Sequence, residues 1–162
     1  MDTITIRPYR DADREMLWSL KRGFELGLAA DDDEKQRAYE GKLDGDYQNG
    51  YLSWVRRCLD ENERALQVAT HEGDLVGYVF VLPESLSYIW DGAVLNEVFV
   101  REEYRGSGVG DRLMEAALSV ARTQSLPLDR MVLDVDRSNE RARSFYERWG
   151  FDHWGEMVAR EL

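Results

Sequence analysis

Apolar residues recur along the chain with two different periods, and these periods predict alternating strands and helices. Residues 3–7 alternate between polar and apolar side chains and end before Pro8, which is the pattern of a short strand. Residues 11–28 carry apolar side chains with helical spacing, so they predict an amphipathic helix. Its apolar stripe consists of Met16, Leu17, Leu20 and Phe24.

The same two periods continue to the end of the chain. The predicted elements are a strand at 3–7, helices at 11–28 and 47–59, strands at 66–70, 75–82 and 94–100, a helix at 108–124, a strand at 131–135, a helix at 139–149 and a closing strand at 153–160. Residues 71–74 form the turn of a hairpin around Gly73. This order predicts a mixed α/β sheet, and a length of 162 residues favours a single domain spanning 1–162.

Two details of the N-terminal half bear on chemistry. Residues 31–34 are all acidic, and we predict no regular element for them. Cys58, the single cysteine, falls on the inward stripe of the helix at 47–59 and has no histidine nearby in sequence. We therefore interpret it as a core residue rather than a nucleophile.

Composition excludes several classes of protein. One cysteine permits no intrachain disulfide, and no apolar stretch approaches the roughly 20 residues that span a bilayer. The N-terminus lacks the apolar region of a signal peptide. Neither His71 nor His153 has the spacing of a metal site, so we expect no metal. These features predict a soluble cytoplasmic protein without a membrane partner.

The chain is strongly acidic, with a formal net charge of −11. Proteins that bind the phosphate backbone are normally basic, so we expect no nucleic-acid partner. Lysine occurs only at Lys21, Lys35 and Lys42, and an acidic surface with few lysines suits a salt-rich cytoplasm. We attribute the charge first to habitat or solubility and second to the steering of a cationic substrate.

A glycine-rich turn between a predicted strand and a predicted helix is the main chemical feature. Gly106, Gly108 and Gly110 alternate with other residues, which lets backbone N–H groups point into one concavity at a helix N-terminus. A pyrophosphate suits such a site. A Walker loop would need a lysine after the glycines, and a dinucleotide fingerprint would need glycine where Asp111 stands.

Two motifs of this chain resemble those of the Gcn5-related N-acetyltransferases. Arg105-x-x-Gly108-x-Gly110, with Val98-Phe99-Val100 before it, is similar to the acyl-CoA signature of that family. Residues 139–151 follow its second motif, N-x-x-A-x-x-F-Y-x-x-x-G-F. The resemblance implies a mostly antiparallel twisted sheet of about six to seven strands with about four helices, splayed between the fourth and fifth strands.

The same resemblance implies how acetyl-CoA, the acyl donor, is bound. The pyrophosphate lies on the N–H groups of Arg105, Gly106, Ser107, Gly108, Val109 and Gly110. The pantetheine arm pairs with backbone at Val98, Phe99 and Val100 like an added strand. Asn139 matches a position that contacts this arm, and it also suits the N-cap of its own helix. Tyr146 matches a tyrosine that faces the sulfur and can protonate or hydrogen-bond the departing thiolate. The alternative is an ordinary buried aromatic residue beside Phe145.

Two acids compete for the role of the base that takes the amine proton. Glu97 lies in the middle of a strand, where a carboxylate is costly without a partner or a function. Asp134 lies on the next strand, twelve positions before Tyr146. The resemblance implies an acid at this place in relatives that acetylate protein N-termini, where the commoner residue is a glutamate of longer reach. We prefer Glu97 slightly. Pairing of either acid with an arginine, and proton loss to water alone, remain as alternatives.

The family resemblance predicts an N-acetyltransferase that acts by direct attack in a ternary complex, with a primary amine as acceptor: a protein N-terminus, a lysine or a small molecule. We expect the acceptor pocket at residues 27–51 and 84–92, where acids and aromatic residues suit a cationic amine. A non-catalytic acyl-CoA sensor or regulatory module is the alternative, and another acyl group is a third hypothesis. A homodimer is left open.

Overall fold

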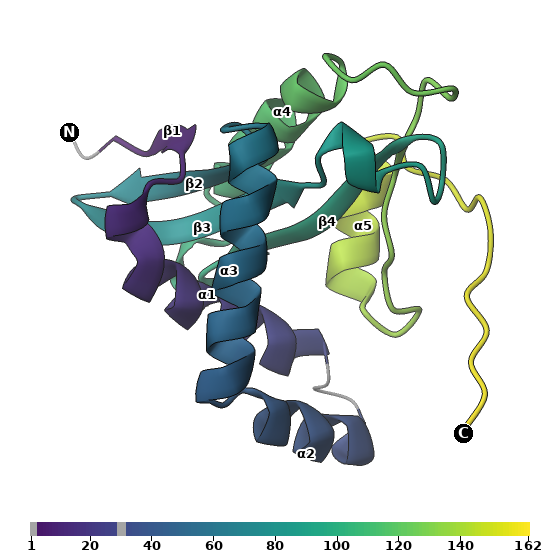
Figure 1. Cartoon of the computed structure of the whole chain (residues 1–162), viewed down its shortest axis with the longest axis horizontal. Coiled ribbons are helices and arrows are strands. Elements are labelled where there is room, and N and C mark those ends of the chain that lie inside the picture. Colours follow the sequence, from purple (N-terminus) through teal and green to yellow (C-terminus); the bar gives the residue numbers. More distant parts are fainter. Residues whose placement is uncertain (1–2, 29–31) are drawn as a thin grey trace.

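Five strands follow one another across a single sheet in the order of the sequence (Figure 1). The computed structural model describes residues 3–28 and 32–162. The strands are β1 (Thr5–Pro8), β2 (Leu66–His71), β3 (Asp74–Val81), β4 (Ala93–Val100) and β5 (Met131–Val132). The α-helices are α1 (Arg14–Leu28), α2 (Asp33–Lys42), α3 (Gly45–Glu61), α4 (Val109–Ala121) and α5 (Glu140–Arg148).

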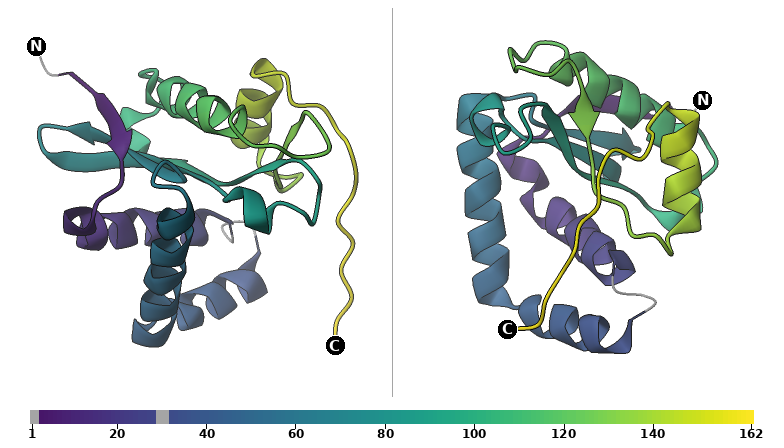
Figure 2. Two further views of the ribbon diagram at one scale, coloured as in Figure 1. Left: turned by 45° about the horizontal axis from the view of Figure 1, so that its top comes forward. Right: turned by 90° about the vertical axis from the view of Figure 1, so that its right-hand side faces the viewer.

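The helices cover both faces of the sheet. Figure 2 shows α4 and α5 on one face and α1, α2 and α3 on the other. Alternate residues of β3 supply the two cores: Tyr78 and Phe80 pack with α1 and α3, whereas Val79 packs with Leu113 and Met114 of α4. Cys58 is buried in the first core, as predicted, and burial raises the pKa of its thiol to about 11.

The sheet opens between β4 and β5. β1 to β4 pair antiparallel, whereas β4 and β5 pair parallel and only at Ala93 with Met131 and Val94 with Val132. From Leu95 onwards, no described strand lies on that side of β4. The expected splay between the fourth and fifth strands is therefore present, and it leaves an open β4 edge that leads to the glycine loop.

Two details of the predicted fold were wrong. Within the described residues the sheet has five strands rather than six to seven. The expected closing strand at 153–160 is absent, because residues 149–162 form neither helix nor strand. β5 spans two residues and offers almost no edge for a further strand. The C-terminal segment instead runs along the outside of the molecule (Figure 2), with Met157 75% and Val158 91% exposed.

One helix, α2, was not predicted, so residues 3–28 and 32–162 contain five α-helices instead of about four. Its N-cap is Asp32, whose side chain accepts a hydrogen bond from the Lys35 backbone N–H at 3.0 Å. The acidic run therefore begins a helix, where negative charge is favourable; Asp31 lies outside the described residues. α2 buries none of its residues, and so it has no apolar stripe that a sequence pattern would reveal.

Candidate active site

The loop between β4 and α4 forms a cradle of backbone N–H groups. Gly106 and Gly108 have φ of 78° and 88°, the left-handed conformation that glycine adopts without strain. In the described part of the chain, the N–H groups of residues 106–110 have no protein acceptor. A Cβ at either glycine would meet no other atom within 4 Å, so the cradle is open. A pyrophosphate group fits this arrangement.

Close packing holds the cradle against α5. A Cβ on Gly110 would lie 3.3 Å from the ring of Phe145, so only glycine permits this approach without movement of the ring. The Asp111 carboxylate accepts hydrogen bonds from Arg148 at 2.9 Å and from the Trp149 indole N–H at 2.8 Å. The two sequence motifs therefore form one unit in space, with the loop and α5 fixed to each other.

Arg105 joins this loop to the end of β4. Its Nε donates to the Val100 carbonyl at 3.0 Å, and its guanidinium lies 5.6 Å from the centre of the Phe99 ring. Burial and the nearby Arg141 lower the pKa of Arg105. The arginine of the first motif thus fixes the loop at the end of the open β4 edge, where Val98, Phe99 and Val100 follow one another.

α5 presents Tyr146 toward the apolar side of the sheet that α4 covers. The Asn139 side chain caps this helix by accepting from the Ala142 N–H at 3.1 Å, as its position predicts. The Tyr146 ring packs against Phe145 and Phe151. Burial raises the pKa of its hydroxyl to about 12, so the group is protonated at neutral pH. Among the described residues, that hydroxyl has no hydrogen-bond partner.

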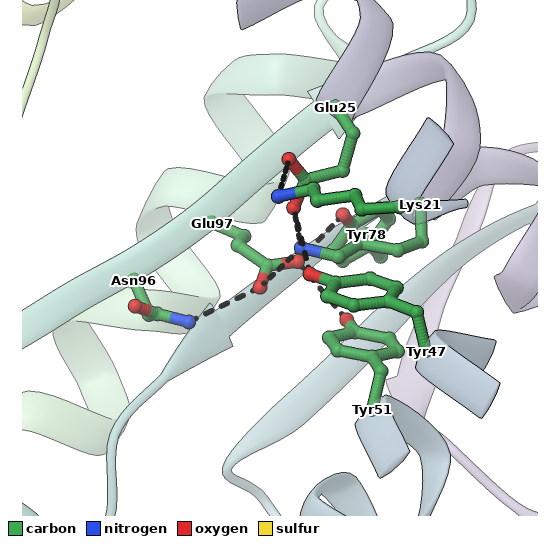
Figure 3. A network of polar contacts seen from close by, with 8 residues as sticks. Lys21, Glu25, Tyr47, Tyr51, Tyr78, Asn96 and Glu97 are labelled. Atoms are coloured by element: carbon green, nitrogen blue, oxygen red, sulfur yellow. Dashed lines mark hydrogen bonds and ion pairs between the residues drawn. The ribbon is translucent and has the colours of Figure 1, made fainter. Parts of the chain in front are cut away.

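Glu97 lies on the opposite face of β4, in a network of polar side chains (Figure 3). Its Oε1 accepts from the hydroxyls of Tyr51 at 3.0 Å and Tyr78 at 2.8 Å. Its Oε2 accepts from Lys21 at 3.2 Å and from Asn96 at 3.1 Å. A carboxylate has about four acceptor positions. All of them are therefore occupied, and Glu97 is 5% exposed.

The tyrosines of this network stay protonated donors. Burial raises the pKa of Tyr51 and Tyr78 well above its usual value, and the Glu97 carboxylate raises it further. Burial also raises the pKa of Tyr47, together with the charge of Glu25. The partner of Glu97 is a lysine rather than the arginine that the sequence analysis considered.

Lys21 connects Glu97 to a second buried carboxylate. Its ammonium bonds Glu25 one helical turn away, and Tyr47 donates to the same Glu25 oxygen at 3.3 Å. The Lys42 ammonium lies 3.0 Å from the other oxygen as an ion pair. Burial opposes charge on Glu25, but Lys21 and Lys42 outweigh it and hold its pKa below the usual range.

A pocket of about 520 Å³ opens beside this network at the β4–β5 split. Its polar lining consists of Lys21, Glu25, Asn96, Glu97 and Asp134. Its aromatic lining consists of Phe24, Tyr47, Tyr51 and Trp54. Asp134 lies two residues after the end of β5 and not on the strand predicted at 131–135, because β5 ends at Val132. It is exposed and makes no ion pair or hydrogen bond with another described residue. One pocket therefore contains both acids that the sequence proposed as bases.

Comparison with known proteins identifies the family. The model of the acetyltransferase (GNAT) family matches residues 15–151. The chain belongs to this family. It is 31% identical to a 5-NmdU N-acetyltransferase of Pseudomonas phage PaMx11, over 78% of this chain and 83% of the relative. It is 27% identical to a spermine/spermidine N(1)-acetyltransferase of Bacillus subtilis, over 68% of this chain and 76% of the relative.

Solved structures share the GNAT fold. The PaiA N-acetyltransferase of Thermoplasma acidophilum, solved in complex with coenzyme A, superposes with a TM-score of 0.72 at 21% identity, covering 93% of this chain and 90% of that chain. The protein is an acetyl-CoA-dependent N-acetyltransferase of the GNAT family. None of its described helices is long and apolar enough to cross a membrane.

Some of the residues that line the pocket beside Glu97 lie in the segments where the sequence predicted an acceptor pocket. The acceptor pocket was expected at residues 27–51 and 84–92. The pocket beside Glu97 takes Leu28, Tyr47, Gly50 and Tyr51 from the first segment, and no residue of the second segment lines it. The sequence analysis missed Lys21 and Glu25. One signal was present, because both lie four residues apart on the buried side of a helix whose neighbours Leu17 and Leu20 are apolar.

Proposed function

We propose that the protein transfers an acetyl group from acetyl-CoA directly to a primary amine held in the pocket beside Glu97. The observation that carries this proposal is the position of that pocket. It takes residues from β4 and from the segment after β5, so it meets the open β4 edge where an extended acyl arm would pair. Donor and acceptor would then approach from opposite faces of the sheet.

Residues of the chain account for each part of the donor. The N–H groups of residues 106–110 bind the pyrophosphate, and the α4 N-terminus adds partial positive charge. The Arg105 N–H, which was also expected to bind it, instead donates to the Glu102 carbonyl at 3.1 Å. The backbone of Val98, Phe99 and Val100 pairs with the arm and donates to the thioester carbonyl. Asn139 contributes near the arm in addition to capping α5. Cys58 is buried and does not line the pocket, which supports direct transfer without an acyl-enzyme.

The reaction needs one proton acceptor and one proton donor. The amine nitrogen forms a bond to the thioester carbonyl carbon, the carbon–sulfur bond breaks, and the amine loses a proton while the thiolate gains one. A proton that reached Glu97 would have to displace one of its four donors, whereas Asp134 has open acceptor positions. We therefore assign the base to Asp134, and we assign to Glu97 the role of positioning Lys21, Tyr51 and Tyr78.

Tyr146 is the proposed proton donor to sulfur, and its replacement tests this role. We expect Tyr146→Phe to lower kcat by about 10²-fold, the usual scale for a general acid, with little change in acetyl-CoA affinity. The negative charge on sulfur exists mainly in the transition state, so the hydroxyl contributes little to ground-state binding. Steady-state rates and calorimetric titration measure the two effects. Equal turnover by variant and wild type would remove Tyr146 from this role.

Thiol release from acetyl-CoA across a panel of primary amines tests the proposed function as a whole. The panel contains short alkylamines, aromatic amines, diamines, polyamines, aminoglycosides and N-terminal peptides. We expect release that depends on the amine, with an acetylated product identified by mass spectrometry. Acetyl-CoA binding with no turnover on any amine would instead support the alternative, a non-catalytic sensor or regulatory module.

A further inference from the structure

One ammonium group of the protein, that of Lys21, lies in the pocket lining, and a second, that of Lys42, contacts the lining at Glu25 and Tyr47. Lys21 lies between Glu25 and Glu97, and Lys42 lies against the other oxygen of Glu25. The Lys21 and Glu25 side chains are 4% and 6% exposed, so their charges are poorly screened by water. Two lysines therefore balance two glutamates, and the network at the inner end of the pocket carries no uncompensated charge.

The aromatic rings of the pocket face the same two cations. The Lys21 ammonium lies 4.5 Å from the centre of the Tyr51 ring and 5.1 Å from that of Phe24. The Lys42 ammonium lies 4.9 Å from the centre of the Tyr47 ring. An aromatic ring attracts a cation within about 6 Å of its centre. Three of the four aromatic residues thus already contact a lysine, and the fourth, Trp54, packs on Phe80.

Among the described residues that line the pocket, Asp134 is the one carboxylate without a cation. Asp134 is exposed, and no described residue pairs with it. One ammonium group of a ligand would neutralise the Asp134 carboxylate. A second ammonium inside the pocket would lose its hydration and meet Lys21 without finding a free carboxylate, which is unfavourable. The net charge of −11 attracts every cation to the protein, so discrimination among cations must arise in the pocket itself.

We infer that the acceptor is a primary amine with a single positive charge and an apolar or aromatic body, and that Lys21 and Lys42 exclude polycationic amines. The inference rests on the proposed function, because it assumes that the acceptor binds in this pocket. The ammonium lies at Asp134, and the body of the molecule lies along Phe24, Leu28 and Trp54. Specificity here arises by built-in repulsion of the wrong substrate as well as by attraction of the right one.

Hexylamine and hexamethylenediamine form a matched test pair that differs by one ammonium. We expect kcat/KM for hexylamine to exceed that for the diamine by about tenfold or more, after correction for the diamine's two amino groups. We also expect kcat/KM for 2-phenylethylamine to exceed that for spermidine by a similar factor. Equal or better use of the diamine or of spermidine would overturn the inference.

A charge-removing variant tests the cause of this preference. Lys42→Met keeps the side-chain stem but leaves one oxygen of Glu25 without its cation. We therefore expect the kcat/KM for the diamine, divided by that for the monoamine, to rise by roughly fivefold. This factor is the upper end of the contribution of one partly exposed ion pair. The control is Lys35→Met on the same helix, whose ammonium contacts the Tyr39 ring and, among the described contacts, no residue that lines the pocket. An unchanged ratio in a folded Lys42→Met protein would overturn the role of the lysines.

Equilibrium binding separates this inference from the proposed function. Calorimetric titration of hexylamine and hexamethylenediamine into the complex with coenzyme A requires no turnover. If no amine is acetylated, the proposed function fails, and the order of the two affinities still decides the inference. Tighter binding of the monoamine supports a pocket for one ammonium, whereas tighter binding of the diamine contradicts it.

Discussion

Gly108→Val is expected to abolish the binding of acetyl-CoA. At 100-fold excess over Kd, a ligand that binds only the native state stabilises a protein by about 2.7 kcal/mol. This gain should appear in wild type as a higher thermal midpoint and should be lost in the variant. The valine side chain would fill the open space over the loop, and φ of 88° at this position is strained for a β-branched residue.

Backbone strain alone would also lower the midpoint, so the experiment needs a control with equal strain. Gly73 has φ of 85° in the β2–β3 hairpin, and a Cβ there would also meet no other atom within 4 Å. Gly73→Val should therefore lose comparable stability, about 1–3 kcal/mol, while it keeps the full shift with acetyl-CoA. A full shift in folded Gly108→Val would rule out the placement of the pyrophosphate on this loop.

The cradle was predictable because it depends on local signals, whereas the splay of the sheet was expected only from the resemblance to the GNAT family. Alternating glycines between a strand and a helix specify a turn that leaves backbone N–H groups free, and the second motif encodes the helix that packs on it. The contact of Gly110 with Phe145 joins these two segments, which are 35 residues apart by residue number. Each motif is short and local, so each was recognisable from the order of its residues.

The polar network was not predicted because its members come from four separate elements. Lys21 lies on α1, Tyr51 on α3, Tyr78 on β3 and Glu97 on β4, and only tertiary packing brings them together. A carboxylate in the middle of a strand predicts that Glu97 has a partner, but no spacing rule identifies a partner 76 residues away. The helix α2 was missed for a different reason, because it is stabilised at its ends without a buried face.

Asp134→Asn is expected to lower kcat/KM at neutral pH by about 10²-fold or more, the usual scale for loss of a general base. The rate should partly recover as pH rises. A primary amine with a pKa near 10.4 is mostly protonated at pH 7, and its neutral fraction grows about tenfold per pH unit below that value. A variant that no longer removes the proton therefore depends on this neutral fraction. Asp129→Asn, an exposed change of equal charge next to β5 and outside the pocket, serves as the control.

Glu97→Gln should give a different result, since Glu97 is assigned a positioning role. The amide keeps the shape of the side chain but places a donor where Lys21, Tyr51, Tyr78 or Asn96 now donates. A buried donor left without an acceptor costs about 1–3 kcal/mol, so a lower thermal midpoint is expected. The decrease in rate should be smaller than for Asp134→Asn, and its pH profile should stay parallel to that of wild type.

The two pH–rate profiles therefore distinguish three routes for the proton. If Glu97→Gln alone caused a steep loss of rate at neutral pH with recovery at high pH, Glu97 would be the base. The hydrogen bonds around Glu97 would then have to rearrange when the amine binds. Unchanged profiles in both variants would mean that the proton leaves to solvent and that neither acid is the base. The measurement needs an acceptor identified from the amine panel, since a slow surrogate would conceal the loss of a base. Acetyl-CoA binding must be intact in each variant, because only then does a change in rate report on the proton rather than on the donor site.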